Sequence, residues 1–175
     1  MKNYVKEGQK LPLFGIGPYL ISSLAMLSLI GIILSGNVLS SGRVSGIWFW
    51  VFIIAGILFI LSGIFIWYKG ALGSKMDEYI ENNKLKTDGI YAWVRNPMYT
   101  GVWFIVTGVT LLWHNAWLLI LFPVDWIILT VVLKNTEEKW LLNLYGADYA
   151  AYIVRVNRCI PIKRFKKKTN IERTS

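Results

Sequence analysis

The sequence predicts an all-α integral membrane protein, a helical bundle of about four transmembrane helices followed by a cytoplasmic C-terminal helical segment. Hydrophobic residues make up 55% of the 175 residues and charged residues only 17%, which is more apolar surface than one soluble core of this size can bury. Nine Trp, nine Tyr and eight Phe add amphipathic rings of the kind that collect at membrane interfaces. We therefore expect the lipid bilayer to be the solvent for much of the chain.

Two segments have the length of a transmembrane helix, which needs roughly 20 apolar residues to cross a hydrocarbon core about 30 Å thick. Leu13 to Leu34 and Val44 to Tyr68 contain no Asp, Glu, Lys or Arg. We interpret the first as a retained helix, because no convincing small-residue cleavage pattern follows it. Both are predicted to span the membrane.

A third apolar region extends from Tyr99 to Leu133, and its only His, Asp, Glu, Lys or Arg residues are His114 and Asp125. This region is too long for one span, so it predicts two short spans that fold back at His114 and Asn115. Beyond it, residues 135–156 have helical spacing broken at Gly146. The chain therefore divides into two N-terminal helices (1–70), a region with the helical hairpin and cytoplasmic binding segments (71–162), and a basic tail (163–175).

The basic residues predict the orientation of the bundle. Three Lys residues precede Leu13, five Lys or Arg residues lie from Lys69 to Arg95, and ten follow from Lys134 onward, against Arg43 alone after the first span. Cytoplasmic segments concentrate Lys and Arg, so we expect both termini to be cytoplasmic. An even number of spans fits this distribution.

Charge and composition also restrict the partners. The formal charge is +9, but the basic residues flank apolar segments instead of lining an exposed face, which argues against a nucleic-acid partner. Cys159 and His114 are the only Cys and His, so we expect no disulfide framework and no metal site. The expected partners are the bilayer and a lipophilic or lipidated small molecule, and the oligomeric state stays open.

Polar clusters at the ends of apolar spans are candidates for a functional site. The first cluster extends from Lys84-Leu85-Lys86, through the turn Thr87-Asp88-Gly89, to Arg95-Asn96-Pro97-Met98-Tyr99-Thr100-Gly101. Pro97 forces an extended conformation on Asn96 and can start a helix, whose first amide groups suit a carboxylate. The sequence thus predicts a polar binding site where the third span begins.

The second cluster is Glu137-Glu138, at the end of the fourth span. Adjacent helix positions face different sides, so we expect one carboxylate to hold a ligand hydroxyl or ammonium group while the other stays in water. The third cluster contains Tyr145-Gly146, Tyr149, Tyr152, Arg155 and Pro161. The helical spacing of its tyrosines is by itself typical of interfacial packing.

Taken in order, the three clusters resemble the isoprenylcysteine carboxyl methyltransferase family, with its related bacterial membrane methyltransferases and phospholipid methyltransferases. The family pattern is Arg-His-Pro-x-Tyr-x-Gly, then Glu-Glu, then an aromatic-Gly-x-x-Tyr-x-x-Tyr stretch that ends in Arg and Pro. The match extends from about Lys84 to Pro161, and residues 1–70 match only as generic spans. Two positions depart from the pattern: Asn96 replaces the usual His, and Leu133, with Lys134 beside it, stands where the eukaryotic enzymes carry an Arg.

The resemblance implies binding of S-adenosyl-L-methionine, but it assigns no catalytic residue. The residues that it implies in contact with this methyl donor are Lys84, Leu85, Lys86, Tyr91, Asn96, Pro97, Met98, Tyr99 and Glu137. Asp125, Lys134 and Arg155 are the candidates for contact with the methyl acceptor, although Asp125 can equally well hydrogen-bond a neighbouring helix. Asn96 keeps a donor and an acceptor but has no titratable group, so we expect no proton transfer at this position.

The sequence leaves three functions open. The leading one is methyl transfer from S-adenosylmethionine to a lipophilic or membrane-partitioning carboxylate, thiol or lipid amine at the cytoplasmic face. A nicotinamide-dependent membrane reductase is the second, because sterol reductases share a related Arg-His-Pro-x-Tyr stretch that holds a nicotinamide cofactor. The third is a non-catalytic membrane partner protein, which the loss of the family His and Arg would favour.

Overall fold

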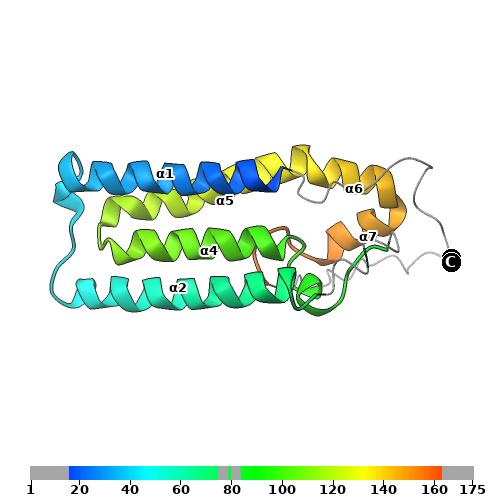
Figure 1. Ribbon diagram of the computed structural model, residues 1–175, viewed down its shortest axis with the longest axis horizontal. Helices are drawn as coiled ribbons and strands as arrows, with labels where there is room; N and C mark the ends of the chain where they lie inside the picture. Colours follow the sequence, from blue (N-terminus) through cyan, green and yellow to red (C-terminus); the bar gives the residue numbers. More distant parts are fainter. Residues whose placement is uncertain (1–15, 75–78, 80–83, 163–175) are drawn as a thin grey trace, which may run out of the picture.

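The structure, a computed structural model, describes residues 16–74, 79 and 84–162. Helices α1, α2, α4 and α5 lie side by side, and the shorter helices α6 and α7 extend from one end of the bundle (Figure 1). In chain order the elements are α1 (Gly17–Asn37), η1 (Ser40–Gly42), α2 (Ile47–Ala71), η2 (Gly89–Ala92), α4 (Pro97–Leu112), η3 (Ala116–Ile120), α5 (Leu121–Asn135), α6 (Glu137–Tyr145) and α7 (Ala147–Arg155). The described residues form helices and isolated bridges but no β-sheet, so the predicted all-α bundle is confirmed.

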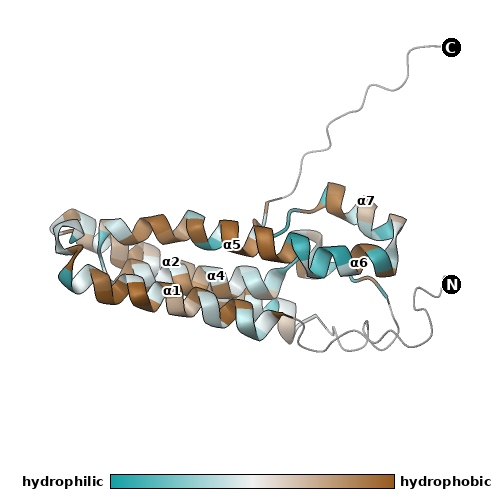
Figure 2. Cartoon of the chain, turned by 90° about the horizontal axis from the view of Figure 1, so that it is seen from above, coloured by the Kyte–Doolittle hydropathy of each residue, from teal (hydrophilic) through white to brown (hydrophobic). Residues whose placement is uncertain are grey.

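Length and hydropathy identify the described helices that can cross a bilayer. Gly17–Asn37, Ile47–Ala71 and the 30-residue stretch Ala116–Tyr145, which contains η3, α5 and α6, are long and apolar enough to do so. The α4 helix has 16 residues and is therefore about 24 Å long, a little short of the hydrocarbon thickness. Hydrophobic residues dominate the bundle, whereas hydrophilic residues gather on α6 (Figure 2). The chain is an integral membrane helical bundle in which α4 falls a little short of the hydrocarbon thickness.

The fold-back at His114 and Asn115 is present as the sequence predicts. His114 adopts a positive φ of 41°, and the Asn115 side chain accepts a hydrogen bond from Trp117 N at 2.9 Å. The Asn115 amide also donates to Leu39 O at 2.8 Å, which ties the hairpin to the end of α1. The predicted break at Gly146 is present as well, with a φ of 54° between α6 and α7.

Helix boundaries differ from the predicted spans by a few residues. The α1 helix starts at Gly17 and continues to Asn37, past the predicted end at Leu34, while Leu13 lies outside the described residues. The α2 helix covers Ile47–Ala71 instead of starting at Val44. Polar and small residues next to an apolar stretch can continue a helix, so hydropathy alone places such ends only within a few residues.

Glycines bring α2 and α4 into direct backbone contact. A Cβ atom on Gly63 would lie 2.6 Å from the carbonyl oxygen of Gly101, and one on Gly108 would lie 2.6 Å from that of Gly56. A Cβ on Gly70 would lie 2.8 Å from the ring of Pro97. Small residues allow such close helix packing in membranes, where lipid gives little hydrophobic drive for association. This contact fixes the start of α4 against the end of α2.

The described basic residues are distributed as predicted along the bundle axis. Arg43 lies in the connection between α1 and α2, at the end where α4 and α5 are joined (Figure 1). The other described Lys and Arg residues belong to the opposite end, where α4 begins and α6 and α7 lie. The basic tail 163–175 and the three Lys residues before Leu13 lie outside the described residues.

Candidate functional site

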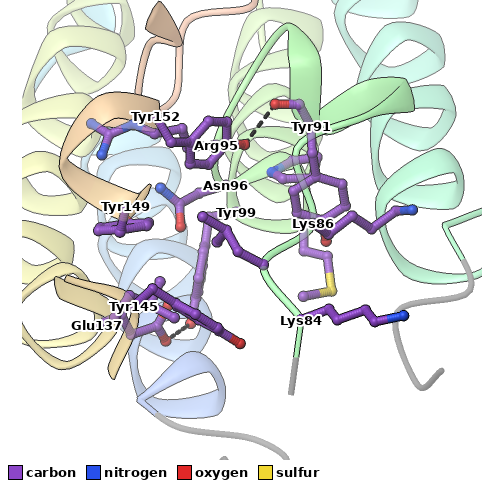
Figure 3. A pocket seen from close by; sticks show the side chains of 14 residues that line it. Lys84, Lys86, Tyr91, Arg95, Asn96, Tyr99, Glu137, Tyr145, Tyr149 and Tyr152 are labelled. Atoms are coloured by element: carbon purple, nitrogen blue, oxygen red, sulfur yellow. Dashed lines mark hydrogen bonds between the residues drawn. The ribbon is translucent and has the colours of Figure 1, made fainter. Parts of the chain in front are cut away.

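A cavity lies at the end of the bundle where α4 begins and α6 and α7 pack against it. It contains about 720 Å³ of free space, including the part that is open to solvent. Figure 3 shows the side chains around it, among them five tyrosines, and we call it the tyrosine cavity. Its lining residues are Lys84, Leu85, Lys86, Tyr91, Arg95, Asn96, Pro97, Met98, Tyr99, Glu137, Leu141, Tyr145, Tyr149 and Tyr152.

All nine residues that the sequence assigned to a donor site line this cavity. They come from segments far apart in the chain: the stretch 84–91, the first turn of α4 and the start of α6. Helical packing thus brings together residues that the motifs identified separately. This convergence makes the tyrosine cavity the candidate site.

The first wall of the cavity is the segment that leads into α4. The Tyr91 hydroxyl donates to Gly70 O at 3.2 Å, and the Tyr152 hydroxyl donates to Tyr91 O at 2.6 Å. Burial raises the pKa values of the Tyr91 and Tyr152 phenols above their usual range. Both phenols therefore stay protonated near neutral pH and keep these hydrogen bonds.

Pro97 is the first residue of α4, as its position in the sequence predicts. Its missing N–H costs nothing there, because the first amide groups of a helix have no intrahelical acceptor. The N–H groups of Met98 and Tyr99 in this first turn belong to residues that line the cavity. The start of α4 therefore offers the cavity a partial positive charge.

Glu137 contributes a carboxylate to the cavity. The hydroxyl of Tyr99 donates a hydrogen bond to Glu137 Oε1, and the backbone of Ile16 also hydrogen-bonds to this carboxylate. Glu137 is the first residue of α6. Its side chain is thus oriented by a residue of α4 and by the residue before α1. Glu137 lines the cavity, and the expectation that it holds a ligand group stays a prediction.

The expectation that the other carboxylate stays in water is wrong. Glu138 is only 6% exposed, and Arg158 donates to its two oxygens from Nε at 2.6 Å and from Nη2 at 2.7 Å. Arg95 Nη1 lies 3.0 Å from Glu138 Oε1. The chain after α7 folds back beside the start of α4. This return places Arg158 over Glu138, whose carboxylate would otherwise face solvent.

Arg95 is a lining residue that the sequence analysis did not assign. Its side chain is 3% exposed, and its guanidinium carbon lies 6.0 Å from the centroid of the Tyr149 ring. Its contact with Glu138 is an ion pair, and Nη1 has no hydrogen-bond partner among the described residues. The Arg that opens the family pattern was the available signal for its importance.

Tyr145, Tyr149 and Tyr152 were also missed, because their spacing alone is typical of interfacial packing. The structure buries all three, at 4%, 1% and 3% exposure, and places them on the cavity wall. Burial raises the pKa of Tyr149 to about 12, so its ring and hydroxyl stay neutral. Packing and cavity lining are therefore not exclusive, and the spacing of Tyr149 and Tyr152 was the signal for a shared face of α7.

The two lysines at the cavity edge differ in their environment. Lys86 Nζ lies 2.8 Å from Asp88 Oδ1 and 3.9 Å from the centroid of the Tyr79 ring, so its charge is already compensated. The ammonium ends of Lys84 and Lys86 both point away from Tyr145 and Tyr149 (Figure 3). Their alkyl stems face the cavity, as amphipathic side chains often do.

The three residues that the sequence assigned to the methyl acceptor do not line the cavity. Asp125 is 1% exposed, and it lies in α5 about 18 Å along the helix direction from Glu137. Lys134 and Arg155 are exposed, and Arg155 Nε donates to Ala151 O at 3.3 Å within its own helix. None of the three is among the residues that line the tyrosine cavity.

Comparison with known proteins identifies the family. A family model described as phospholipid methyltransferase matches residues 50–148, which is more than half of the chain and includes most of α2 and all of α4, α5 and α6. No curated protein and no solved structure matches the chain significantly. With a membrane helical bundle and a cavity built from the family-like motifs, the chain belongs to the phospholipid methyltransferase family of membrane methyltransferases.

Proposed function

We propose that this protein transfers a methyl group from S-adenosyl-L-methionine to a lipophilic or membrane-partitioning acceptor at the cytoplasmic face of the membrane. The observation that carries the proposal is the convergence of all nine motif residues on one cavity in a chain of the phospholipid methyltransferase family. The concentration of Lys and Arg at the cavity end of the bundle supports its cytoplasmic placement.

The lining residues suit the chemical groups of this donor. Glu137 offers a carboxylate to an ammonium group or a ribose hydroxyl. Tyrosine rings attract cations and stack on flat heterocycles, and five of them surround the cavity. The first-turn amide groups of α4 can receive a carboxylate. A cationic sulfonium, an adenine ring and an amino acid end therefore all have matching groups here.

When bound, S-adenosylmethionine supplies a methyl group on a positively charged sulfur that a nucleophile can displace. The protein's own contribution is to hold and to exclude water. Glu137 is oriented by the Tyr99 hydroxyl, and buried Tyr149 and Tyr152 form a dry wall. Fixed orientation and exclusion of water supply much of the rate in such reactions. Asn96 has no titratable group, so it serves for binding.

The acceptor is a carboxylate, a thiol or a lipid amine. The family description names phospholipids, which puts a lipid amine first. A carboxylate needs no base, whereas an amine must lose its proton before it attacks. Among the described lining residues, Glu137 is the one with a carboxylate. If the acceptor is an amine, its proton therefore passes to Glu137 or to water. Leu133 in place of the family Arg makes a prenylcysteine carboxylate a weaker candidate.

The decisive experiment uses full-length protein purified in detergent, S-adenosylmethionine labelled in its methyl group, and three acceptors in separate reactions. These are vesicles of a phospholipid with a primary amine headgroup, a prenylated cysteine analogue with a free carboxylate, and a long-chain alkyl thiol. We expect label in the organic extract of one reaction. Tyr99→Ala should lose this label, whereas the control Tyr19→Ala, which alters an 80% exposed side chain, should keep it.

Three results would decide against the proposal. Binding of a nicotinamide dinucleotide in preference to S-adenosylmethionine would support a reductase. Binding of the methyl donor without transfer to any acceptor, including a total membrane lipid extract, would support a non-catalytic partner protein. Absence of binding to S-adenosylmethionine would overturn the donor assignment itself.

A further inference from the structure

A short segment after α7 returns to the tyrosine cavity. We call residues 156–160 the C-terminal strap. It lies beyond residue 148, where the match to the family model ends. Val94 and Asn157 form a parallel bridge, and Arg95 N donates to Asn157 O at 2.9 Å. The Thr100 hydroxyl donates to Cys159 O at 2.9 Å. The strap is therefore hydrogen-bonded to the start of α4 on both sides of Asn96.

Asn96 is attached to the strap through its backbone and its side chain. Its backbone N–H donates to Arg158 O at 3.1 Å, and its side-chain Nδ2 donates to the same oxygen at 3.3 Å. A carbonyl oxygen can only accept hydrogen bonds. The partner therefore settles the orientation of the Asn96 amide: the nitrogen faces the strap and Oδ1 faces the other way.

The free end of this amide faces the cavity. Asn96 is a lining residue, and in Figure 3 its oxygen points away from the strap toward the level of Tyr99 and Tyr149. Among the described residues none donates a hydrogen bond to Asn96 Oδ1. Asn96 is also only 9% exposed, so a ligand in the cavity is the natural partner for this oxygen.

We propose that the C-terminal strap makes Asn96 a hydrogen-bond acceptor, which recognises an N–H group of the methyl donor. The inference rests on the proposed function, because it takes S-adenosylmethionine as the ligand. The donor has two such groups, the 6-amino group of adenine and the α-ammonium group. Asn96 therefore does not bind the carboxylate of the donor, which needs a hydrogen-bond donor and is left to the amide groups at the start of α4.

The same geometry accounts for Asn at a position where the family pattern has His. A neutral imidazole has one N–H and one unprotonated nitrogen. With its N–H on the Arg158 carbonyl, it would present an acceptor to the cavity, as Asn does. The strap thus explains how two different side chains can serve one role.

Ion pairs hold the strap in place. The Arg158 side chain makes two hydrogen bonds to Glu138, at 2.6 Å and 2.7 Å, while its carbonyl makes the two contacts with Asn96. Arg158 is therefore a positioning residue: its charge anchors the strap to α6, and its backbone orients Asn96.

The test measures binding of S-adenosylhomocysteine and two analogues by calorimetry, with full-length protein in detergent. One analogue lacks the adenine amino group and the other lacks the α-amino group. For the wild type we expect one analogue to bind about tenfold more weakly than the parent compound. Asn96→Leu has a side chain of nearly the same size without an acceptor. This variant should bind the parent compound about tenfold more weakly than the wild type does. It should bind the parent compound and the discriminated analogue equally well.

Asn96→His provides the matched rescue, because it restores an acceptor on a residue that can still donate to the Arg158 carbonyl. We expect it to restore discrimination at pH 8. A merely structural role of Asn96 would lower the thermal stability and weaken all three ligands by the same factor. If Asn96→Leu prefers the parent compound over each analogue by the same factors as the wild type, the inference is wrong although the donor assignment stands. Failure of the wild type to bind S-adenosylhomocysteine would instead overturn the proposed function.

Discussion

Arg158 and Glu138 form a two-point ion pair, with Nε to Oε1 at 2.6 Å and Nη2 to Oε2 at 2.7 Å. It joins the C-terminal strap to α6 beside the tyrosine cavity. Glu138 also has Arg95 Nη1 at 3.0 Å. Removing one member of a buried pair leaves an uncompensated charge, which costs about 3 to 5 kcal/mol. The neighbouring Glu137 has a different environment, with Tyr99 as its hydrogen-bond donor.

The two glutamates should therefore respond differently to the same substitution. We expect Glu137→Gln to weaken donor binding by roughly tenfold or more, which is the cost of one charged hydrogen bond, with little change in thermal stability. Glu138→Gln should lower the melting temperature first, because Arg158 and Arg95 lose their counterion. Donor titration and thermal unfolding of both variants separate the two effects. A larger loss of affinity in Glu138→Gln at a temperature where both variants are folded would contradict this assignment.

The close contact between α2 and α4 predicts a sharp difference between two glycines. Gly63→Ala places a Cβ 2.6 Å from Gly101 O, whereas a Cβ on Gly36, in α1, would have no neighbouring atom within 4 Å. Overpacking of this kind costs about 1 to 3 kcal/mol. Gly36→Ala should be neutral or stabilising by about 0.5 to 1 kcal/mol, since alanine favours a helix. Equal melting temperatures of the two variants would show that the helices pack differently.

The orientation of the bundle is tested by accessibility labelling of single cysteines. Ser45 lies at the hairpin end of the bundle and Asn143 lies in α6, and both are exposed. In a Cys159→Ala background, Ser45→Cys should react with an impermeant maleimide from outside the cell and Asn143→Cys only after the membrane is opened. Asn115 is a poor site for such a label, because it is 1% exposed and caps η3. Labelling of both cysteines from the same side would refute the predicted topology.

The sequence predicted much of the fold because the relevant signals are local, whereas the nine residues that line the cavity came from the resemblance to the methyltransferase family. Pro97 starts α4, and Gly146 separates α6 from α7. Runs of apolar residues define α1 and α2. Each of these features depends on neighbouring residues, so periodicity, length and composition identify it without knowledge of the partners.

What the sequence did not predict depends on contacts between distant segments. The burial of Glu138 requires Arg158, twenty residues further along the chain, and the amide orientation of Asn96 requires the carbonyl of the same residue. The pairing of Gly63 with Gly101 depends on the register of two antiparallel helices. Asp125 was an ambiguous candidate for the same reason, because only packing decides that it lies far from the cavity lining.

The buried thiol of Cys159 predicts a loss of stability in alkaline solution. Burial raises its pKa to about 12, while an unfolded thiol ionises near about 8.5. Above about pH 8.5 the unfolded state therefore loses a proton that the folded state keeps. The contribution of the protonated thiol to the free energy of unfolding is complete below about pH 8.5 and declines as the pH rises toward about 12. Between about pH 8.5 and 10, below the usual pKa of tyrosine, the melting temperature should fall less steeply in Cys159→Ala. Parallel slopes for the two proteins would exclude a contribution from this thiol.

The last prediction compares two tyrosines that both line the cavity. Tyr99 is anchored to Glu137 by its hydroxyl and lies in the first turn of α4, so Tyr99→Ala should abolish methyl transfer while the protein stays inserted in the membrane. Tyr149 is 1% exposed and its ring centroid lies 6.0 Å from that of Tyr152, so Tyr149→Ala should mainly lower stability, by about 3 to 5 kcal/mol as for other large buried rings.

Donor affinity, turnover and thermal unfolding are measured side by side on both variants in detergent, with Tyr99→Phe as the control that removes only the hydroxyl. Tyr99→Phe should keep the ring and lose the orientation of Glu137, which gives an intermediate loss of turnover. If Tyr99→Ala still binds the donor and transfers its methyl group normally, the site is not at the start of α4. The methyltransferase chemistry would then have to be sought elsewhere in the chain.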